Sequence, residues 1–224
     1  AAPCGGSRNA PIAEYWKNNE SVQYEIQITE QDMLKAFSSA GTMGSFISAQ
    51  LETLQASREF DQFITWKKFV SDKTKFKETS AYETLSAFDG ESIWKKIREI
   101  TQSMRFPTSK YNVQEDIAMS GGMTVIITAE AHRLIDSYLA PIYHTDLIGI
   151  SDVDIIDVDS FATPTGSDEI VFQIWDDRAL GYYPKTPRAT SNFNGRALST
   201  TNFLTVQGTY TAAKYRNAYC AIKP

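Results

Sequence analysis

The chain has 224 residues, of which 42% are hydrophobic and 22% are charged, with a net charge of −5. This composition is typical of a folded protein with one large domain or two small ones, and it excludes wholesale disorder. Cys4 and Cys220 permit one disulfide but exclude a secreted disulfide framework. No apolar run approaches the roughly 20 residues that cross a bilayer, and no signal peptide is recognisable. We therefore expect a soluble protein made inside the cell. Its first residues, AAPCGG, lack a methionine and indicate a processed or trimmed product.

The charges are unevenly distributed along the chain. Residues 134–177 contain ten acidic residues and no Lys or Arg, whereas residues 178–224 contain seven Lys or Arg and no Asp or Glu. Two separate solvated surfaces would explain this pattern, since charge distribution bears on association rather than on fold. The alternative is that acidic and basic faces of neighbouring copies meet head to tail, a contact that builds rings and larger assemblies.

The first elements are an arm, a strand and a short helix. Residues 1–20 are rich in Gly, Pro, Asn and Ala and predict an irregular arm. VQYEIQI, residues 22–28, alternates apolar and polar side chains, which predicts a half-buried strand. Thr29 and Asp32 then fit a capping box that opens a short helix.

A long helix is expected next. Residues 45–70 contain no Pro or Gly, which allows one helix about 39 Å long at ~1.5 Å per residue. The apolar side chains before Ser57 lie nearly opposite to those after it. Either the helix breaks near Ser57, or it runs across an elongated body and meets a different partner at each end, since a helix of a compact bundle would keep one stripe.

The remaining elements alternate between helices and strands. The Lys-rich residues 67–78 predict a turn that leads into a strand, and Asp89 can cap a helix that runs up to Pro107. One face of that helix is apolar at i, i+4, i+7 and i+11, with Ile93, Ile97, Ile100 and Met104. We further expect a strand at 123–128, a helix ending at Pro141, strands at 153–158 and 169–175, and two final strands within 203–222. Strands and helices are mixed without a strict βαβ repeat, so the class is α+β.

No catalytic constellation is recognisable. His132 and His144 lack the H-E-x-x-H spacing of a zinc site, and no G-x-S-x-G elbow is present. Neither cysteine has the His and Asn arrangement of a thiol nucleophile. We therefore predict a protein that is not an enzyme, with no catalytic residue, no cofactor and no metal.

Four aspartates in SDVDIIDVDS, residues 151–160, are the strongest candidate for chemistry: Asp152, Asp154, Asp157 and Asp159. A calcium loop would need an oxygen ligand where Ile156 stands. The intervening Val and Ile residues favour a strand with wet carboxylate edges, while an ion site and a catalytic carboxylate pair remain alternatives. The adjacent Ile155 and Ile156 break the alternation, so Asp157 and Asp159 either point to the other face or follow a bulge.

The basic residues are a second candidate surface. The lysines between residues 67 and 77 fit a solvated turn, and contact with nucleic-acid phosphates is the alternative. We take two sets as candidates for contacts between subunits. The basic set, which could also face DNA, is Lys67, Lys68, Lys73, Lys75, Lys77, Arg188 and Arg196, and the acidic set is Asp152, Asp154, Asp157 and Asp159.

Four stretches carry a family resemblance. They are DMLKAFSSAGTMGSFISAQLETLQASREFDQFITWKKFV, SIWKKIREITQSMRFPTSKYN, MTVIITAEAHRLIDSYLA, and VDIIDVDSF followed by VFQIWDDRALGYYPK. In order and spacing the chain resembles the major capsid proteins of small short-tailed phages of Gram-positive hosts, which have the Hong Kong 97-type fold. The resemblance extends over about residues 24–222. Members of that family carry further residues before this point, namely an N-terminal arm and most of an extended loop.

The resemblance implies a division into domains. Residues 1–23 would be an irregular arm or the remnant of the extended loop. A peripheral domain would comprise residues 24–84, with a spine helix at 45–70 and long strands from 73–84, and would include return strands within 183–212. An axial domain would comprise residues 85–182 and the closing strand within 213–224, with the aspartates near the symmetry axis.

The resemblance also implies a function. The chain would be a shell subunit that assembles itself into pentamers and hexamers of an icosahedral phage head. The head would enclose double-stranded DNA without sequence specificity, with scaffolding and portal proteins as further partners and no membrane. We expect assembly in the bacterial cytoplasm and a final location in the virion. The alternatives are an encapsulin-like shell around a protein cargo and a metal-dependent enzyme that uses the aspartates.

Overall fold

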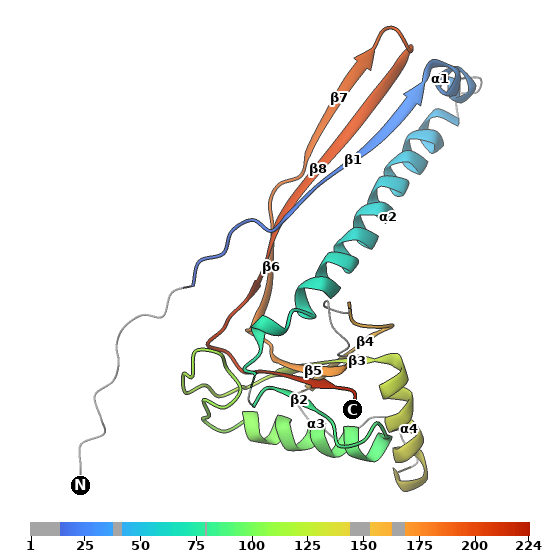
Figure 1. The fold of residues 1–224 in the computed structure, drawn as a ribbon. Coiled ribbons are helices and arrows are strands. Elements are labelled where there is room, and N and C mark those ends of the chain that lie inside the picture. Colours follow the sequence, from blue (N-terminus) through green and yellow to red (C-terminus); the bar gives the residue numbers. More distant parts are fainter. Residues whose placement is uncertain (1–13, 38–41, 79, 144–152, 163–168) are drawn as a thin grey trace, which may run out of the picture.

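Two sheets and four α-helices make up the described part of the chain, in an elongated arrangement (Figure 1). The computed structural model describes residues 14–37, 42–78, 80–143, 153–162 and 169–224. We call the five-stranded sheet and the two helices packed on it the body. We call the four-stranded sheet and the long helix beside it the arm, which extends away from the body (Figure 1).

The sheet of the arm is built around one long strand, β8 (Ser199–Ala212). β1 (Glu20–Thr29) pairs antiparallel with one edge of β8, and β6 (Leu180–Pro184) and β7 (Arg188–Asn194) pair in succession with the other edge. Burial alternates along β1, which confirms the period-2 prediction for this strand. All seven residues of β7 are exposed.

The helices of the arm follow β1 directly. α1 (Glu30–Phe37) begins with the predicted capping box, because Asp32 N donates to Thr29 Oγ1 at 3.3 Å and Thr29 N donates to Asp32 Oδ2 at 3.4 Å. α2 (Thr42–Val70) is a single helix of 29 residues. Of the two alternatives for this segment, the continuous helix is therefore correct.

The sheet of the body has the strand order β2-β9-β5-β3-β4. β2 is parallel to β9 and β3 is parallel to β4, while the pairs β9–β5 and β5–β3 are antiparallel. The bounds are β2 (Tyr82–Thr84), β9 (Ala218–Ile222), β5 (Ile170–Asp176), β3 (Met123–Thr128) and β4 (Val153–Val158). Every residue of the central strand β5 is buried, so this sheet contains the core of the molecule.

Two helices pack on the five-stranded sheet of the body. α3 (Gly90–Met104) is capped by Asp89, whose Oδ1 accepts from Ser92 N at 2.8 Å, and its predicted apolar face is buried. It crosses α4 (Ala129–Tyr143) so closely that a Cβ at residue 90 would collide with the carbonyl group of Leu134, which explains the glycine there.

Two sequence predictions about secondary structure are wrong. α4 continues past Pro141 to Tyr143. Lys73–Lys75 is a single turn of 3-10 helix, and β2 pairs with β9 of the body, so residues 73–84 supply no long strand to the sheet of the arm. β7 and β8 lie within 183–212, where the resemblance implied return strands, and β8 supplies the backbone partners of both β6 and β7.

Candidate functional site at the end of the long helix

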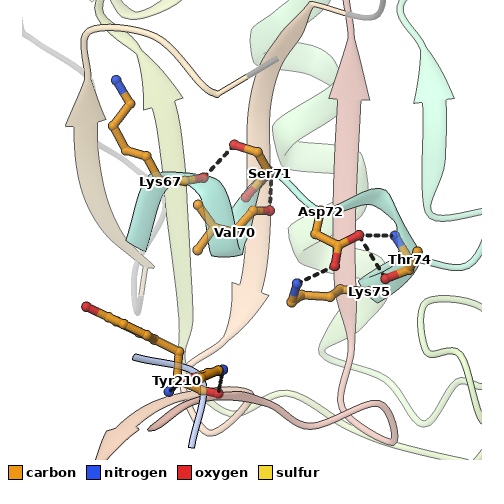
Figure 2. A network of polar contacts seen from close by, with 9 residues as sticks. Lys67, Val70, Ser71, Asp72, Thr74, Lys75 and Tyr210 are labelled. Carbon is orange, nitrogen blue, oxygen red and sulfur yellow. Dashed lines mark hydrogen bonds and ion pairs between the residues drawn. The ribbon is translucent and has the colours of Figure 1, made fainter. Parts of the chain in front are cut away.

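The last turn of α2 is joined to the body by hydrogen bonds between side chains and backbone groups. Ser71 Oγ donates to the carbonyl of Lys67 at 2.6 Å (Figure 2) and accepts from Ala162 N at 3.1 Å. Gln173 Nε2, from the buried strand β5, donates to the carbonyl of Val70 at 3.0 Å. The final carbonyls of a helix have no partner within the helix, so these side chains satisfy them where the arm joins the body.

An ion pair reinforces the same junction. Lys67 Nζ lies 2.6 Å from Asp159 Oδ1 and 3.3 Å from Ser160 Oγ. Lys67 is only 7% exposed, whereas the Asp159 side chain is 70% exposed. The hydrogen bond from Lys67 lowers the pKa of Asp159. One candidate of each charge, proposed from the sequence for contacts between copies, thus meets the other within one chain.

The turn after α2 is held by its own charges (Figure 2). Asp72 Oδ1 accepts from Thr74 N at 3.0 Å, and Asp72 Oδ2 pairs with Lys75 Nζ at 2.8 Å. Lys75 Nζ also lies 4.1 Å from the ring centre of Phe69, and burial lowers the pKa of Lys75. These contacts favour the turn interpretation of the lysine cluster, at least for Lys75.

The other basic candidates lie in two places. Lys77 pairs with Glu115 at 3.0 Å, and Lys68 and Lys73 are exposed near the end of α2. Arg188 is exposed on β7, and Arg196 is exposed in the turn between β7 and β8. The five lysines thus lie in the last turn of α2 or in the residues just after it, and the two arginines lie on β7 or in the turn that follows it.

The acidic candidates are spread over an edge strand. Asp152 lies outside the described residues, while Asp154 and Asp157 are exposed on β4. β4 pairs with β3 without a shift of register, so Asp157 points to the face opposite Asp154 and no bulge is present. Asp157 Oδ1 lies 2.6 Å from Nδ1 of His132 on α4. Asp154, Asp157 and Asp159 thus have three different environments.

Neither a metal site nor a membrane-spanning helix is found among the described residues. In residues 14–37, 42–78, 80–143, 153–162 and 169–224, no three His, Cys, Asp or Glu side chains come together as a metal site requires. Within these same ranges, no helix is both long and apolar enough to cross a membrane.

The sequence did not reveal a cluster of tyrosines between α2 and the sheet of the arm. Tyr182 Oη donates to Glu20 Oε2 at 2.7 Å, and the rings of Tyr182 and Tyr210 lie 4.6 Å apart. Glu20 is only 6% exposed, and burial together with its carboxylate raises the pKa of Tyr182 to about 12. Burial and the neighbouring Asp61 likewise raise the pKa of Tyr24 to about 12. Only one member of this cluster could be expected from the sequence, because the alternation of apolar and polar residues in β1 predicts that Tyr24 is half-buried.

The α+β fold is similar to that of solved phage capsid structures and is of the Hong Kong 97 type. The capsid structure of Staphylococcus phage Andhra matches with a TM-score of 0.68 at 14% identity, over 92% of this chain and 70% of the other. A chain in the structure of the head fiber and inner core protein gp22 of native bacteriophage P68 matches at 0.66 and 11% identity, over 92% and 71% of the two chains. The capsid of cyanophage P-SCSP1u matches at 0.63 and 7% identity, over 100% and 80%.

The sequence identifies the family. Residues 11–221 match the model of the Phi29-like phage major capsid protein, so the chain belongs to that family. No protein in the curated set matches the sequence. The predicted resemblance, the α+β capsid fold and the function as a phage major capsid protein are confirmed, and the chain is a component of the virion.

Proposed function

We propose that this chain assembles into pentamers and hexamers of an icosahedral head that encloses double-stranded DNA, and that it acts without catalysis. The observation that carries the proposal is the match to the Phi29-like major capsid family over residues 11–221. The shape supports it, because the arm extends from the body with one strand, β7, exposed at every residue (Figure 1). A shell subunit can cover such a strand with a neighbouring copy.

We assign the arm to the peripheral domain and the body to the axial domain. In this division the peripheral domain contains β1, α1, α2, β6, β7 and β8. The axial domain contains α3, α4 and the five-stranded sheet, including β2, so its first boundary lies before Tyr82 rather than after Thr84. The contacts of Lys67 and Ser71 form the joint between the two domains.

DNA, scaffolding and portal proteins are the proposed partners besides the chain itself. Lys68 and Lys73 are exposed, so they are the lysines of the junction that can reach phosphate groups without breaking a described ion pair. Contacts with a packaged genome would be made to the backbone, which carries the charge and no sequence information. A shell around a protein cargo is not favoured, because the matched structures are phage capsids.

Electron microscopy of the purified chain tests the proposal. We expect rings, sheets or shells in negative stain, and co-purifying nucleic acid in particles taken from infected cells. Assembly should weaken as salt is raised, because exposed charges are screened over ~8–10 Å at moderate ionic strength. A chain that stays monomeric at all concentrations and salt levels, or particles that contain an enzyme in place of DNA, would refute this function.

A further inference from the structure

Two large aromatic side chains are exposed next to each other before the first strand. Tyr15 is 93% exposed and Trp16 is 45% exposed, and both lie in the segment 14–19, which forms neither helix nor strand. Leaving two such rings in water is unfavourable, and Tyr and Trp are the residues that most often anchor protein interfaces. In the described part of the chain their exposure therefore indicates an interface with a partner.

The segment has a fixed place on the sheet of the arm. The side-chain amide of Asn19 donates to Tyr210 O at 2.9 Å and accepts from Tyr210 N at 2.8 Å, which extends the β1 edge of β8 beyond Glu20. At the other end, Glu14 accepts from Lys214 N at 3.1 Å. With both ends attached, Tyr15 and Trp16 are presented along this edge rather than on a loose tail.

The opposite edge of the same sheet carries an aromatic groove. The groove has a volume of about 180 Å³ and lies between the last turns of α2 and the strands β6 and β8. It is lined by Trp66, Phe69, Leu180, Gly181, Tyr182, Tyr210 and Thr211. An apolar cavity of ~150 Å³ is large enough to bind benzene, so this groove can receive an aromatic ring.

We propose that the aromatic pair Tyr15 and Trp16 of one copy docks on the aromatic groove of the next copy, with the ring of Trp16 seated in the groove. The pair and the groove belong to opposite edges of β8, the β1 edge and the β6 edge, so a contact between them joins copies head to tail. A repeated head-to-tail contact closes a ring or continues a lattice. The inference rests on the proposed function, because it names a contact by which the chain would assemble.

Charge complementarity supports the same pairing. Lys17 follows the aromatic pair and is exposed. Glu59 lies seven residues before Trp66, which is two turns along the same face of α2, and it is also exposed. An aromatic contact at the base of the groove would thus bring a cation of one copy towards the carboxylate of the other, which favours this orientation over its reverse.

Disulfide trapping between two different variants tests the contact directly. In chains with Cys4→Ser, a Lys17→Cys variant is mixed under mild oxidation with a Glu59→Cys variant, which leaves the aromatic pair and the groove intact, and the matched control mixes Lys17→Cys with Lys95→Cys, which is exposed on α3. Since each chain carries one of the two introduced cysteines, a bond between them joins two copies. We expect a mixed disulfide dimer at several times the control level. A yield equal to the control would overturn the inference.

A peptide test separates this inference from the proposed function. A fluorescent peptide with the sequence of residues 11–19 should bind the unassembled chain, and binding should weaken at least about tenfold with Trp16→Ala in the peptide or Leu180→Arg in the chain. Thermal unfolding shows whether Leu180→Arg folds, and Leu180→Ala replaces it if not. Groove-dependent binding without any assembly would refute only the function. Assembly with no such binding would refute only the inference.

Discussion

Two strands of seven residues show how differently the two regions of this molecule are built. β5 in the body has every residue buried, whereas β7 in the arm has every residue exposed. β5 lies between two partner strands, with α3 on one side of the sheet and the end of α2 on the other, so its side chains are removed from water on both faces (Figure 1). β7 pairs only with β8 among the described strands.

This difference in burial indicates which region can be stable in a single chain. The body has an apolar core, and burial of such side chains is the main favourable term in folding. In the arm, α2 meets the sheet through tyrosines and Glu20, whose hydrogen bonds contribute a smaller net stability of about 0.5–1.5 kcal/mol each. We therefore expect the arm to gain much of its order from neighbouring copies.

The largest effect should come from deleting a buried ring of the body. Phe172 in β5 is 0% exposed, so Phe172→Ala should lower the free energy of unfolding by about 3–5 kcal/mol. Phe193 in β7 is 64% exposed, and Phe193→Ala should change it by less than about 0.5 kcal/mol. Urea unfolding of the unassembled chain measures both. Equal losses would mean that the arm has a core of its own.

The next effect concerns the joint between the regions. Gln173 is 0% exposed, donates to the carbonyl of Val70 at 3.0 Å and accepts from Trp175 Nε1 at 3.0 Å. Gln173→Leu leaves both partners without that bond, so we expect a loss of about 2–4 kcal/mol. Hydrogen exchange should rise in the last turn of α2, while a control variant at the arm, Gln27→Leu, should leave that turn unchanged. Unchanged exchange after Gln173→Leu would show that the joint does not depend on this side chain.

Local patterns predicted the elements that bury one face within a short stretch. The apolar spacing of α3, its Asp89 cap and the alternation of β1 each depend on neighbours in sequence, and each is confirmed. The strands β6 and β7 depend on β8 for their backbone partners, and no local pattern encodes a partner that lies far along the chain.

The charged candidate residues show the same limit, because the sequence does not reveal which residues the fold brings together. The sequence identified Lys67 and Asp159 as charged residues near turns. It did not reveal that the fold brings these residues, 92 positions apart, together with Lys67 Nζ 2.6 Å from Asp159 Oδ1. The tyrosines around Glu20 come from β1, β6 and β8, so their cluster exists only after the sheet has formed. Whether the exposed candidates Lys68, Lys73, Asp154, Arg188 and Arg196 contact other copies stays a prediction.

The ion pair at the joint should show an asymmetry between its two partners. Asp159→Asn leaves the ammonium group of Lys67 buried without its carboxylate, whereas Lys67→Met removes the buried charge and leaves Asp159 in water. We expect Asp159→Asn to lower the free energy of unfolding more than Lys67→Met does. Denaturant unfolding at pH 7 measures the difference. The reverse order would mean that Lys67 reaches water once its partner is removed.

The smallest effect should appear in acid and should concern the body. Although burial alone would raise the pKa of Glu83, hydrogen bonds from Lys96 at 2.9 Å and Tyr219 at 3.0 Å outweigh it and lower this pKa. A carboxyl group with a lowered pKa in the folded state stabilises the fold above its unfolded pKa of about 4.3, and this stability is lost as the pH falls through the folded value. Stability should therefore decline between about pH 5 and pH 3, and less steeply in Glu83→Gln than in the wild type.

The matched variant Glu25→Gln, on the exposed face of β1, should keep the wild-type slope. Parallel curves for wild type and Glu83→Gln would show that this partly buried network does not contribute to the acid sensitivity of the body.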